Sequence, residues 1–455
     1  MIGSLNGVEN VVNALTAGVT SIGNLAQYFT YEYPGLEMEA YRTEDYIKAM
    51  AIMGEFKDDG VCMHCNLDDG YGALFHDVAN LLGWAMLEKY VAEDLIGGNL
   101  AHCYGNLFSD SFLRIVFNRA LSMINKDGTP GTFVNGNTID YGTSLPRNYG
   151  VLCAYALPDV ACQLTYPSGY AVAPVPFTEA VRIPEPQEII DAHLTLDMVI
   201  EKAPYYARYI DWDKVNADAE ILVTGGNVFF ERVMNALDDM GVDLKHAGEI
   251  AAVLKAIGPA QLEEAFGSGK RDKNAMRGRI PVKPTSIVQT ITKIEDDAIA
   301  KQSFAAGNGP LAGITAVVDS TDVHEFGKEV IRNYLRKAGA QVFDLGTSVA
   351  ISEIVDNLIE TGSKVLCMST YNSMAYSFAR DLLKALKENG LEDSHVLMGG
   401  RLNEAMDGSD VPIDVTDKLT AMGINTDNDI DTIAQVIASY FDRPQGTVSA
   451  SDLKN

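Results

Sequence analysis

The sequence is poor in cysteine, in long apolar runs and in basic residues. It has only 6 cysteines in 455 residues, without regular spacing, which argues for reduced thiols and against a disulfide framework. No apolar stretch approaches the roughly 20 residues of a membrane helix, and no signal-peptide pattern follows Met1. We therefore expect a cytoplasmic protein without a membrane-spanning segment.

Basic residues are outnumbered by acidic ones. Lys and Arg total 35 against 62 Asp and Glu, which gives a formal net charge of -27. Such a charge repels phosphate backbones and anionic membrane surfaces. Nucleic acid and lipid are therefore excluded as expected partners, whereas small molecules and other proteins remain.

The length and texture of the chain predict an α/β protein of two or three domains, at about 150 residues each. Short apolar strands alternate with helical stretches in the first part, helices then dominate, and a basic irregular stretch separates them from a second strand–helix alternation. The expected segments are a partial (β/α) TIM-like barrel at 1–200, a helical cap at 201–266, a connecting arm at 267–309, a flavodoxin-like doubly wound domain at 310–442 and a disordered tail at 443–455.

A polar motif, Asp322-Val-His324-Glu-Phe-Gly327, follows the first strand of the doubly wound domain. Open parallel sheets bind ligands at the carboxyl ends of their strands, so His324 is placed to meet a cofactor. Asp322 is suited to accept a hydrogen bond from one imidazole nitrogen and to leave the other nitrogen as a metal donor. Taken alone, the motif fits better a helix-capping Asp322 beside an exposed loop histidine.

Two later strand ends extend this motif. The third strand ends at Ser369 and Thr370, and the fourth ends at Gly399–Gly400, where missing side chains leave space against the backbone. The three loops together predict a deep slot. Asp-x-His-x-x-Gly, a strand-end serine and Gly-Gly, at these separations, resemble the cobalamin-binding domain of carbon-skeleton mutases and corrinoid methyl carriers.

The resemblance implies a cobalamin whose nucleotide tail leaves the cobalt and threads between strands and helices. His324 is then the lower metal ligand and Asp322 orients it. Ser369 bonds to the buried base, above a floor made by Gly399–Gly400. The family often has leucine where Tyr371 stands, which predicts a reshaped pocket. The expected cofactor-binding residues are Thr321, Asp322, Val323, His324, Glu325, Gly327, Ser369, Thr370, Tyr371, Gly399, Gly400 and Arg401.

The first half of the chain resembles the catalytic subunit of glutamate mutase, also called methylaspartate mutase. Gly18, Thr20 and Ser21 match, as do Gly105–Asn106 and the run from Pro176 to Ala180. This resemblance implies an isomerase dependent on adenosylcobalamin, which rearranges a small carboxylic or amino acid by radical chemistry. The alternatives are a corrinoid methyl carrier or methyltransferase component, and a cobalamin-binding protein without catalysis.

Four aromatic residues are the candidate catalytic side chains. The family's two substrate-contacting tyrosines fall on Phe29 and Tyr33, and Tyr166 and Tyr170 are candidate pocket walls, although packing is the commoner role of a strand-end tyrosine. The family's glutamate for the substrate amino group falls on Gly23. Substrate recognition is therefore expected to differ from that of the family.

The family's early barrel strands, with the arginines that grip the substrate carboxylates, have no counterpart here. A half barrel exposes apolar faces and two sheet edges. We therefore expect a second subunit that supplies the early strands and makes a hetero-oligomer. A homodimer would need Arg42, Arg147 or Arg182 to hold the carboxylate.

A metal site is an alternative use of the polar residues in two early strands. Cys62, His64 and Cys65, with His102 and Cys103 on a later strand, have side chains suited to zinc. Because strand residues alternate between faces, Cys62 and His64 share one face while Cys65 points away. A closed site therefore needs both strands, and the thiols serve equally well as small core residues.

Overall fold

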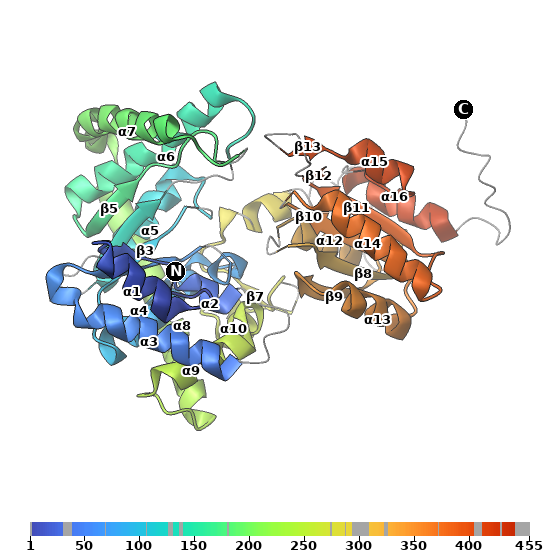
Figure 1. Ribbon diagram of the computed structural model, residues 1–455, viewed down its shortest axis with the longest axis horizontal. Coiled ribbons are helices and arrows are strands. Elements are labelled where there is room, and N and C mark those ends of the chain that lie inside the picture. Colours follow the sequence, from blue (N-terminus) through green and yellow to red (C-terminus); the bar gives the residue numbers. More distant parts are fainter. Residues whose placement is uncertain are drawn as a thin grey trace. The chain divides into compact units, whose positions relative to one another are not determined.

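The computed structural model describes residues 2–30, 39–68, 70–105, 107–125, 131–135, 140–179, 182–273, 275–286, 288–293, 309–322, 326–371, 373–404, 412–427 and 430–441. The chain divides into two compact units, Met1–Gln289 and Thr290–Asn455, which we call unit 1 and unit 2 (Figure 1). The predicted tail at 443–455 lies outside the described residues. Within the described ranges, no helix has both the length and the apolar character needed to cross a membrane.

Unit 1 is built on a parallel sheet in which each strand pairs with the next one along the chain. The order is β1-β2-β3-β4-β5, with helices in the crossovers that parallel strands require. The strands are β1 Ser21–Ile22, β2 Cys62–Asn66, β3 Leu100–Cys103, β4 Thr132–Asn135 and β5 Gly169–Ala173, and a small antiparallel pair follows, β6 Lys270–Arg271 and β7 Arg279–Ile280. The helices are α1 Gly7–Thr16, α2 Ala26–Thr30, α3 Glu39–Glu55, α4 Val78–Lys89, α5 Ser111–Ile124, α6 Leu145–Thr165, α7 Pro186–Tyr206, α8 Trp212–Asp239, α9 Ala247–Ile257 and α10 Pro259–Phe266.

The expected TIM-like barrel is not shown. Among the described strands, β1 and β5 are the edges of an open sheet and do not pair with each other. Sequential parallel strands with intervening helices are common to a barrel arc and to an open sheet, so the alternation in the sequence does not distinguish them. Unit 1 is therefore a mixed α/β unit with a parallel sheet.

Helices α4 and α8 approach closely because glycines face each other where they meet. A Cβ added to Gly83 would lie 2.7 Å from the carbonyl oxygen of Gly226 and equally close to the ring of Phe229. Protein interiors are close-packed, so a larger side chain at this crossing would force α4 and α8 apart and cost them contacts. The helices α4 and α8 thereby fasten the later helical segment of unit 1 to its sheet.

Gly83→Val is expected to lower the free energy of unfolding of unit 1 by about 3 kcal/mol, because the new side chain meets backbone atoms that cannot move aside. The matched control is Gly150→Ala in α6, where an added Cβ meets nothing within 4 Å. The control should leave stability unchanged or raise it by up to about 1 kcal/mol. Urea denaturation of both variants is the measurement, and equal midpoints would contradict the close-packing account.

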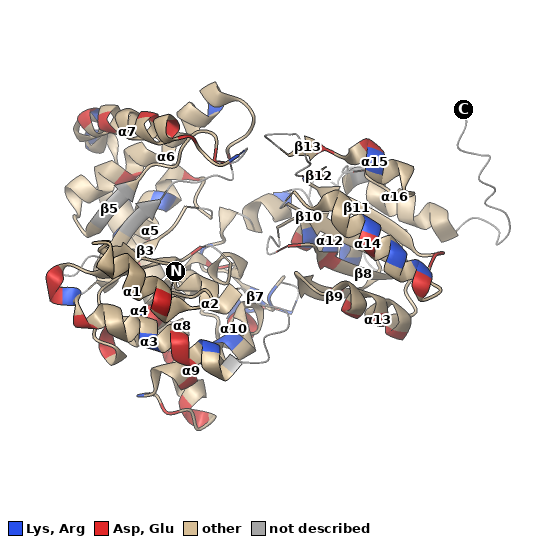
Figure 2. Ribbon diagram, in the orientation of Figure 1, with Lys and Arg blue, Asp and Glu red and all other residues tan. Residues whose placement is uncertain are grey.

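Charged residues are spread along the helices of both units (Figure 2), and a few of them pair inside the protein. Arg114 of α5 donates from Nε to both carboxylate oxygens of Asp159 in α6, at 2.7 and 2.8 Å, and both side chains are buried. Burial raises the pKa of Asp159 to about 6, against the attraction of Arg114. This ion pair joins two neighbouring helices beside the sheet.

A second buried carboxylate, Glu263 of α10, organises the start of α4. It accepts hydrogen bonds from the backbone N–H groups of His76 and Asp77 and from Nδ2 of Asn80, at 2.9 to 3.1 Å. Burial raises the pKa of Glu263 to about 7, against the attraction of Arg277. The folded state therefore favours the protonated carboxyl more than the unfolded state does.

The unfolding free energy of unit 1 is expected to fall as pH rises from about 4.5 to about 7. The sign follows from linkage: a carboxyl whose pKa is raised on folding stabilises the fold below its unfolded pKa and loses that contribution as it ionises, up to about 3 kcal/mol. Glu263→Gln should flatten this dependence. Urea melts at several pH values test it, and an unchanged slope in the variant would contradict the assignment.

Unit 2 is a doubly wound, flavodoxin-like domain. Its parallel sheet has the order β11-β10-β8-β9. The chain places β9 on one side of β8 and then crosses to the other side to form β10 and β11. The strands are β8 Thr315–Ser320, β9 Gln341–Thr347, β10 Val365–Thr370 and β11 His395–Gly400, followed by the small pair β12 Asn403–Glu404 and β13 Ile413–Asp414. The helices are α12 Phe326–Lys337, α13 Ile351–Thr361, α14 Ala375–Glu388, α15 Thr416–Ala421 and α16 Ile430–Phe441.

The two faces of this sheet carry separate cores, because alternate strand residues point to opposite sides. Val317 belongs to the core shared with α13 and α14, whereas Val318 belongs to the core shared with α12 and α16. Figure 1 shows these helices flanking the strands of unit 2. Both faces are covered by helices, so a ligand site is expected at the carboxyl ends of the strands.

Candidate functional site

The candidate site lies where the strand order of unit 2 reverses. The strands β8 and β10 are neighbours, but they lead into α12 and α14, which pack on opposite faces of the sheet. Open α/β sheets bind ligands in the crevice that this divergence leaves at the strand ends. The loops after β8 and β10 are the ones that carry the predicted motif.

Asp322 ties these two loops together. Its carboxylate accepts the backbone N–H of Tyr371 at 2.7 Å, and the side chain is only 6% exposed. The backbone N–H of Thr321 donates in turn to the carbonyl oxygen of Ser369, at 2.9 Å. Asp322 is therefore a junction between the ends of β8 and β10. The motif residues Val323, His324 and Glu325 lie outside the described residues.

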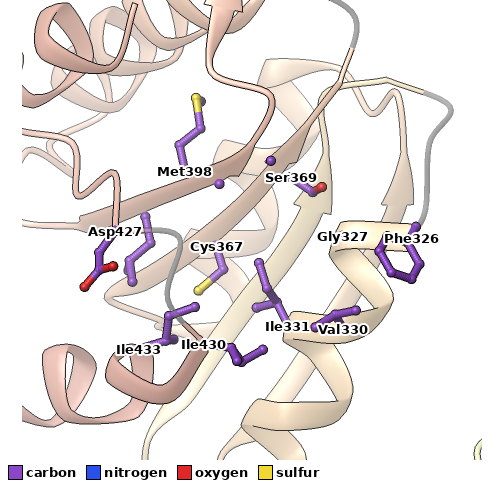
Figure 3. Close-up of a pocket in the computed structure, with 13 residues that line it drawn as sticks. Phe326, Gly327, Val330, Ile331, Cys367, Ser369, Met398, Asp427, Ile430 and Ile433 are labelled. Carbon is purple, nitrogen blue, oxygen red and sulfur yellow. The ribbon is translucent and has the colours of Figure 1, made fainter. Parts of the chain in front are cut away.

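An apolar pocket of about 210 Å³ opens beside this junction (Figure 3). Its walls come from α12, α16, β10 and β11, so residues distant in sequence meet around one space. Among the described residues, Asp427 is the charged member of the lining. The lining consists of Phe326, Gly327, Val330, Ile331, Cys367, Ser369, Leu397, Met398, Gly399, Gly400, Asp427, Ile430 and Ile433.

Two predicted glycines are required by this geometry. A Cβ on Gly327 would overlap the hydroxyl oxygen of Ser369, which lines the same pocket. Gly400 has a φ of 96°, and a Cβ there would overlap the carbonyl oxygen of Thr370. The glycines thus let α12 and the end of β11 approach β10, and they keep the pocket open.

The remaining predicted cofactor residues lie at the ends of β10 and β11. Ser369 and Thr370 are buried at the end of β10. The guanidinium of Arg401 lies 4.2 Å from the ring centroid of Tyr371, and the Arg401 N–H donates to the carbonyl oxygen of Thr370 at 2.8 Å. The structure therefore brings together every predicted cofactor-binding residue that it describes.

A buried charge cluster beside the site was not predicted from the sequence. Lys328 and Arg332 of α12 both bind Asp344 of β9, at 2.8 and 2.7 Å, and Arg332 also contacts Glu329. Burial opposes the ionisation of Asp344, but the two cations lower its pKa below the usual range. Burial raises the pKa of Asp319, the acid that ends the apolar run of β8, to about 7. The charged positions of α12 are visible in the sequence, but their burial is not.

Phe29 and Tyr166, the two candidate catalytic residues whose side chains are described, are not brought together. Phe29 follows β1 and packs edge-on against Trp84, in an aromatic core. Tyr166 precedes β5, at the opposite edge of the sheet, where the Arg119 guanidinium lies 4.0 Å from its ring centroid. Tyr33 lies outside the described residues, and Tyr170 lies in β5, with its side chain outside them. Their catalytic roles stay predictions.

The residues considered for zinc are occupied by other contacts. Cys65 donates to Glu88 at 3.1 Å, and Nε2 of His102 bonds to the other oxygen of Glu88 at 2.9 Å. Burial raises the pKa of the Cys62 thiol to about 12, so it stays protonated. Within the described part of the chain, no three His, Cys, Asp or Glu side chains are grouped to hold a metal ion.

Comparison with known proteins identifies a domain at this site. Residues 313–411 match the B12 binding domain family. Dimethylamine corrinoid protein 2 of Methanosarcina acetivorans is 27% identical over 180 residues, which cover 37% of this chain and 82% of that protein. Dimethylamine corrinoid protein 3 of Methanosarcina mazei is 32% identical over 80 residues, which cover 17% of this chain and 48% of that protein.

One solved structure, a novel cobalamin-binding protein from Desulfitobacterium hafniense DCB-2, is 19% identical. The aligned region covers 34% of this chain and 69% of the Desulfitobacterium protein, with a TM-score of 0.25. That score is too low for an argument from shape, so the fold of unit 2 rests on its own strand order.

These findings support a cobalamin-binding protein and correct one prediction. The expected cobalamin-dependent isomerase is wrong, because the relatives above are named as dimethylamine corrinoid proteins and not as mutases. The motif residues hold a corrinoid in both classes of protein, so they do not reveal which group the cobalt carries. Neither the glutamate mutase family nor the adenosyl form of the cofactor is shown.

Gly327→Ala is expected to weaken cobalamin binding about tenfold or more, because the new methyl group overlaps Ser369 and narrows the pocket. Spectrophotometric titration of the full chain with hydroxocobalamin is the measurement. Gly150→Ala, which adds a methyl group in open space in unit 1, is the control for a glycine-to-alanine change. Undiminished affinity in Gly327→Ala would show that the pocket does not receive the cofactor.

Proposed function

We propose that this protein is a corrinoid methyl carrier. Unit 2 would hold the corrinoid with its nucleotide base in the apolar pocket, and His324 would supply the protein's ligand to cobalt. One observation carries the proposal: Gly327, Ser369 and Gly399–Gly400, from three separate parts of the chain, line a single pocket beside the loop that Asp322 anchors.

The pocket fits one end of a corrinoid better than a whole one. Its volume of about 210 Å³ is below the roughly 300–1,000 Å³ of sites that enclose drug-sized ligands. Its apolar walls, including Val330 and Ile430, suit a flat aromatic base, and the Ser369 hydroxyl adds one polar contact. These features support a displaced nucleotide base and leave the corrin ring at the strand ends.

Asp322 positions the lower ligand. Its carboxylate is fixed by the N–H of Tyr371, and His324 follows it by two residues in the sequence. A carboxylate that bonds to one imidazole nitrogen fixes the tautomer and makes the other nitrogen a better donor to a metal. When bound, a corrinoid would supply the cobalt chemistry of methyl transfer. The chain itself would hold and orient the corrinoid and shield the nucleotide base from water.

The carrier role is favoured over a non-catalytic role by the relatives, which are named as dimethylamine corrinoid proteins. A methyl carrier serves partner enzymes, so we propose a hetero-oligomer with a methyltransferase. In unit 1, the described strands β1 and β5 each have a neighbour on one side alone. Unpaired strand edges are sites where another chain adds strands, and such an addition would extend the sheet toward a barrel.

His324→Ala is expected to weaken cobalamin binding at least about tenfold, because the lower ligand supplies a direct bond to the metal. In the wild type, electron paramagnetic resonance of the Co(II) form should show hyperfine splitting from one protein nitrogen. Growth on ¹⁵N should change that splitting. His193→Ala, at an exposed position of α7, is the matched control.

The same pair of proteins tests the carrier role. Wild-type protein loaded with a labelled methyl group should deliver it to a thiol acceptor when a partner methyltransferase is added, whereas His324→Ala should not. A splitting that ignores the ¹⁵N label, or one that persists in His324→Ala, would overturn the ligand assignment. Binding of cobalamin without any methyl delivery would leave a storage or sensing protein instead.

A further inference from the structure

Arg401 is held in place at the end of β11, directly after the pocket-lining Gly400. The strands β10 and β11 pair in register up to Thr370 and Gly400, and the next residues are Tyr371 and Arg401. The Arg401 guanidinium stacks on the Tyr371 ring at 4.2 Å from its centroid, and its backbone N–H bonds to Thr370. Arginine presents a planar fork of donors from such a stack, which suits recognition of a phosphate or carboxylate.

Tyr371 is itself fixed, because its N–H donates to the buried carboxylate of Asp322 at 2.7 Å. The three residues Asp322, Tyr371 and Arg401 thus link the ends of β8, β10 and β11. A guanidinium supported in this way loses little freedom when it binds an anion, so more of the interaction energy appears as affinity.

The charge around the pocket makes this cation important. The protein has a net charge of -27, and Asp427 is the charged residue among the described lining. A nucleotide tail that carries a phosphodiester therefore needs a nearby cation. Two cations directly follow lining glycines in the sequence, Lys328 after Gly327 and Arg401 after Gly400.

Lys328 is committed elsewhere. Its side chain is 2% exposed and its ammonium lies 2.8 Å from the Asp344 carboxylate, within the buried charge cluster of α12. Arg401 is half-buried at the strand ends, where its guanidinium stacks on an aromatic ring. Of the two cations, Arg401 is the one whose guanidinium lies against the residues that follow β10, next to the pocket-lining Gly400.

We propose that Arg401, supported by Tyr371, binds the phosphodiester of the nucleotide tail and so makes unit 2 select complete cobalamins over corrinoids that lack the nucleotide. The inference rests on the proposed function, since it concerns the same pocket. It adds a specificity-determining residue whose effect is confined to one part of the cofactor.

Binding of hydroxocobalamin and of cobinamide, which lacks the nucleotide and its phosphodiester, tests this assignment on the full chain. Arg401→Gln should weaken cobalamin binding by about 10- to 100-fold, the range of a charge-assisted hydrogen bond, and leave cobinamide binding unchanged. Arg401→Lys should lose less. Tyr371→Leu, which removes the supporting ring, should lose cobalamin affinity alone. Cobalamin affinity should also fall with salt more steeply in the wild type than in Arg401→Gln.

Arg380→Gln is the matched control, because Arg380 is an exposed arginine of α14 that pairs with Asp381. It removes the same charge from unit 2 and should change neither affinity. Equal cobalamin affinity in Arg401→Gln and the wild type would overturn the inference, as would a parallel loss for cobalamin and cobinamide. A wild type that binds cobinamide but not cobalamin would also overturn it. A wild type that binds neither corrinoid would instead overturn the proposed function itself. Melting curves identify any variant that fails to fold, and Arg401→Lys, which keeps the charge, then carries the test.

Discussion

The hydrogen bond from the Tyr371 N–H to the Asp322 carboxylate is the constraint on which the rest of the site depends. It joins the loops after β8 and β10 at the point where the sheet reverses its order. A buried carboxylate is costly unless it accepts such bonds, so the loops are held together by the need to satisfy Asp322. Once they are joined, Gly327 can lie against Ser369, and Arg401 can stack on Tyr371.

One side of α12 carries apolar residues and another carries buried charged residues. Where the helix lines the pocket it presents Val330 and Ile331, and the space beside them is apolar. Toward β9 it buries Lys328 and Arg332, whose charges are balanced by Asp344. A buried charge without its partner is strongly destabilising, so a shift of α12 that separated these charges would be costly. The cluster therefore fixes the helix in one position. The apolar side of the helix therefore stays available as a rigid wall for a ligand.

Much of unit 2 is predictable from the sequence, whereas its pairings are not. The apolar run at 314–318 predicts a strand and the helical spacing at 327–338 predicts a helix, and the structure has β8 at Thr315–Ser320 and α12 at Phe326–Lys337. The stack of Arg401 on Tyr371 and the bond of Asp322 to Tyr371 join residues 30 and 49 positions apart, which no local pattern encodes. In unit 1, Arg119 and Asn216, both distant in sequence, contact Tyr166 just before β5, and no local pattern predicts these contacts. The isomerase prediction failed for another reason, because corrinoid-holding residues are common to several chemistries.

The central claim is that the pocket beside Asp322 receives the nucleotide base of a corrinoid. A crystal structure of the full chain with bound cobalamin tests it most directly. The account predicts density for the base between α12, α16 and β10, in contact with Ile430 and Ser369, with a protein imidazole on the cobalt. A base that remains on the cobalt, with the pocket filled by water or side chains, would contradict it.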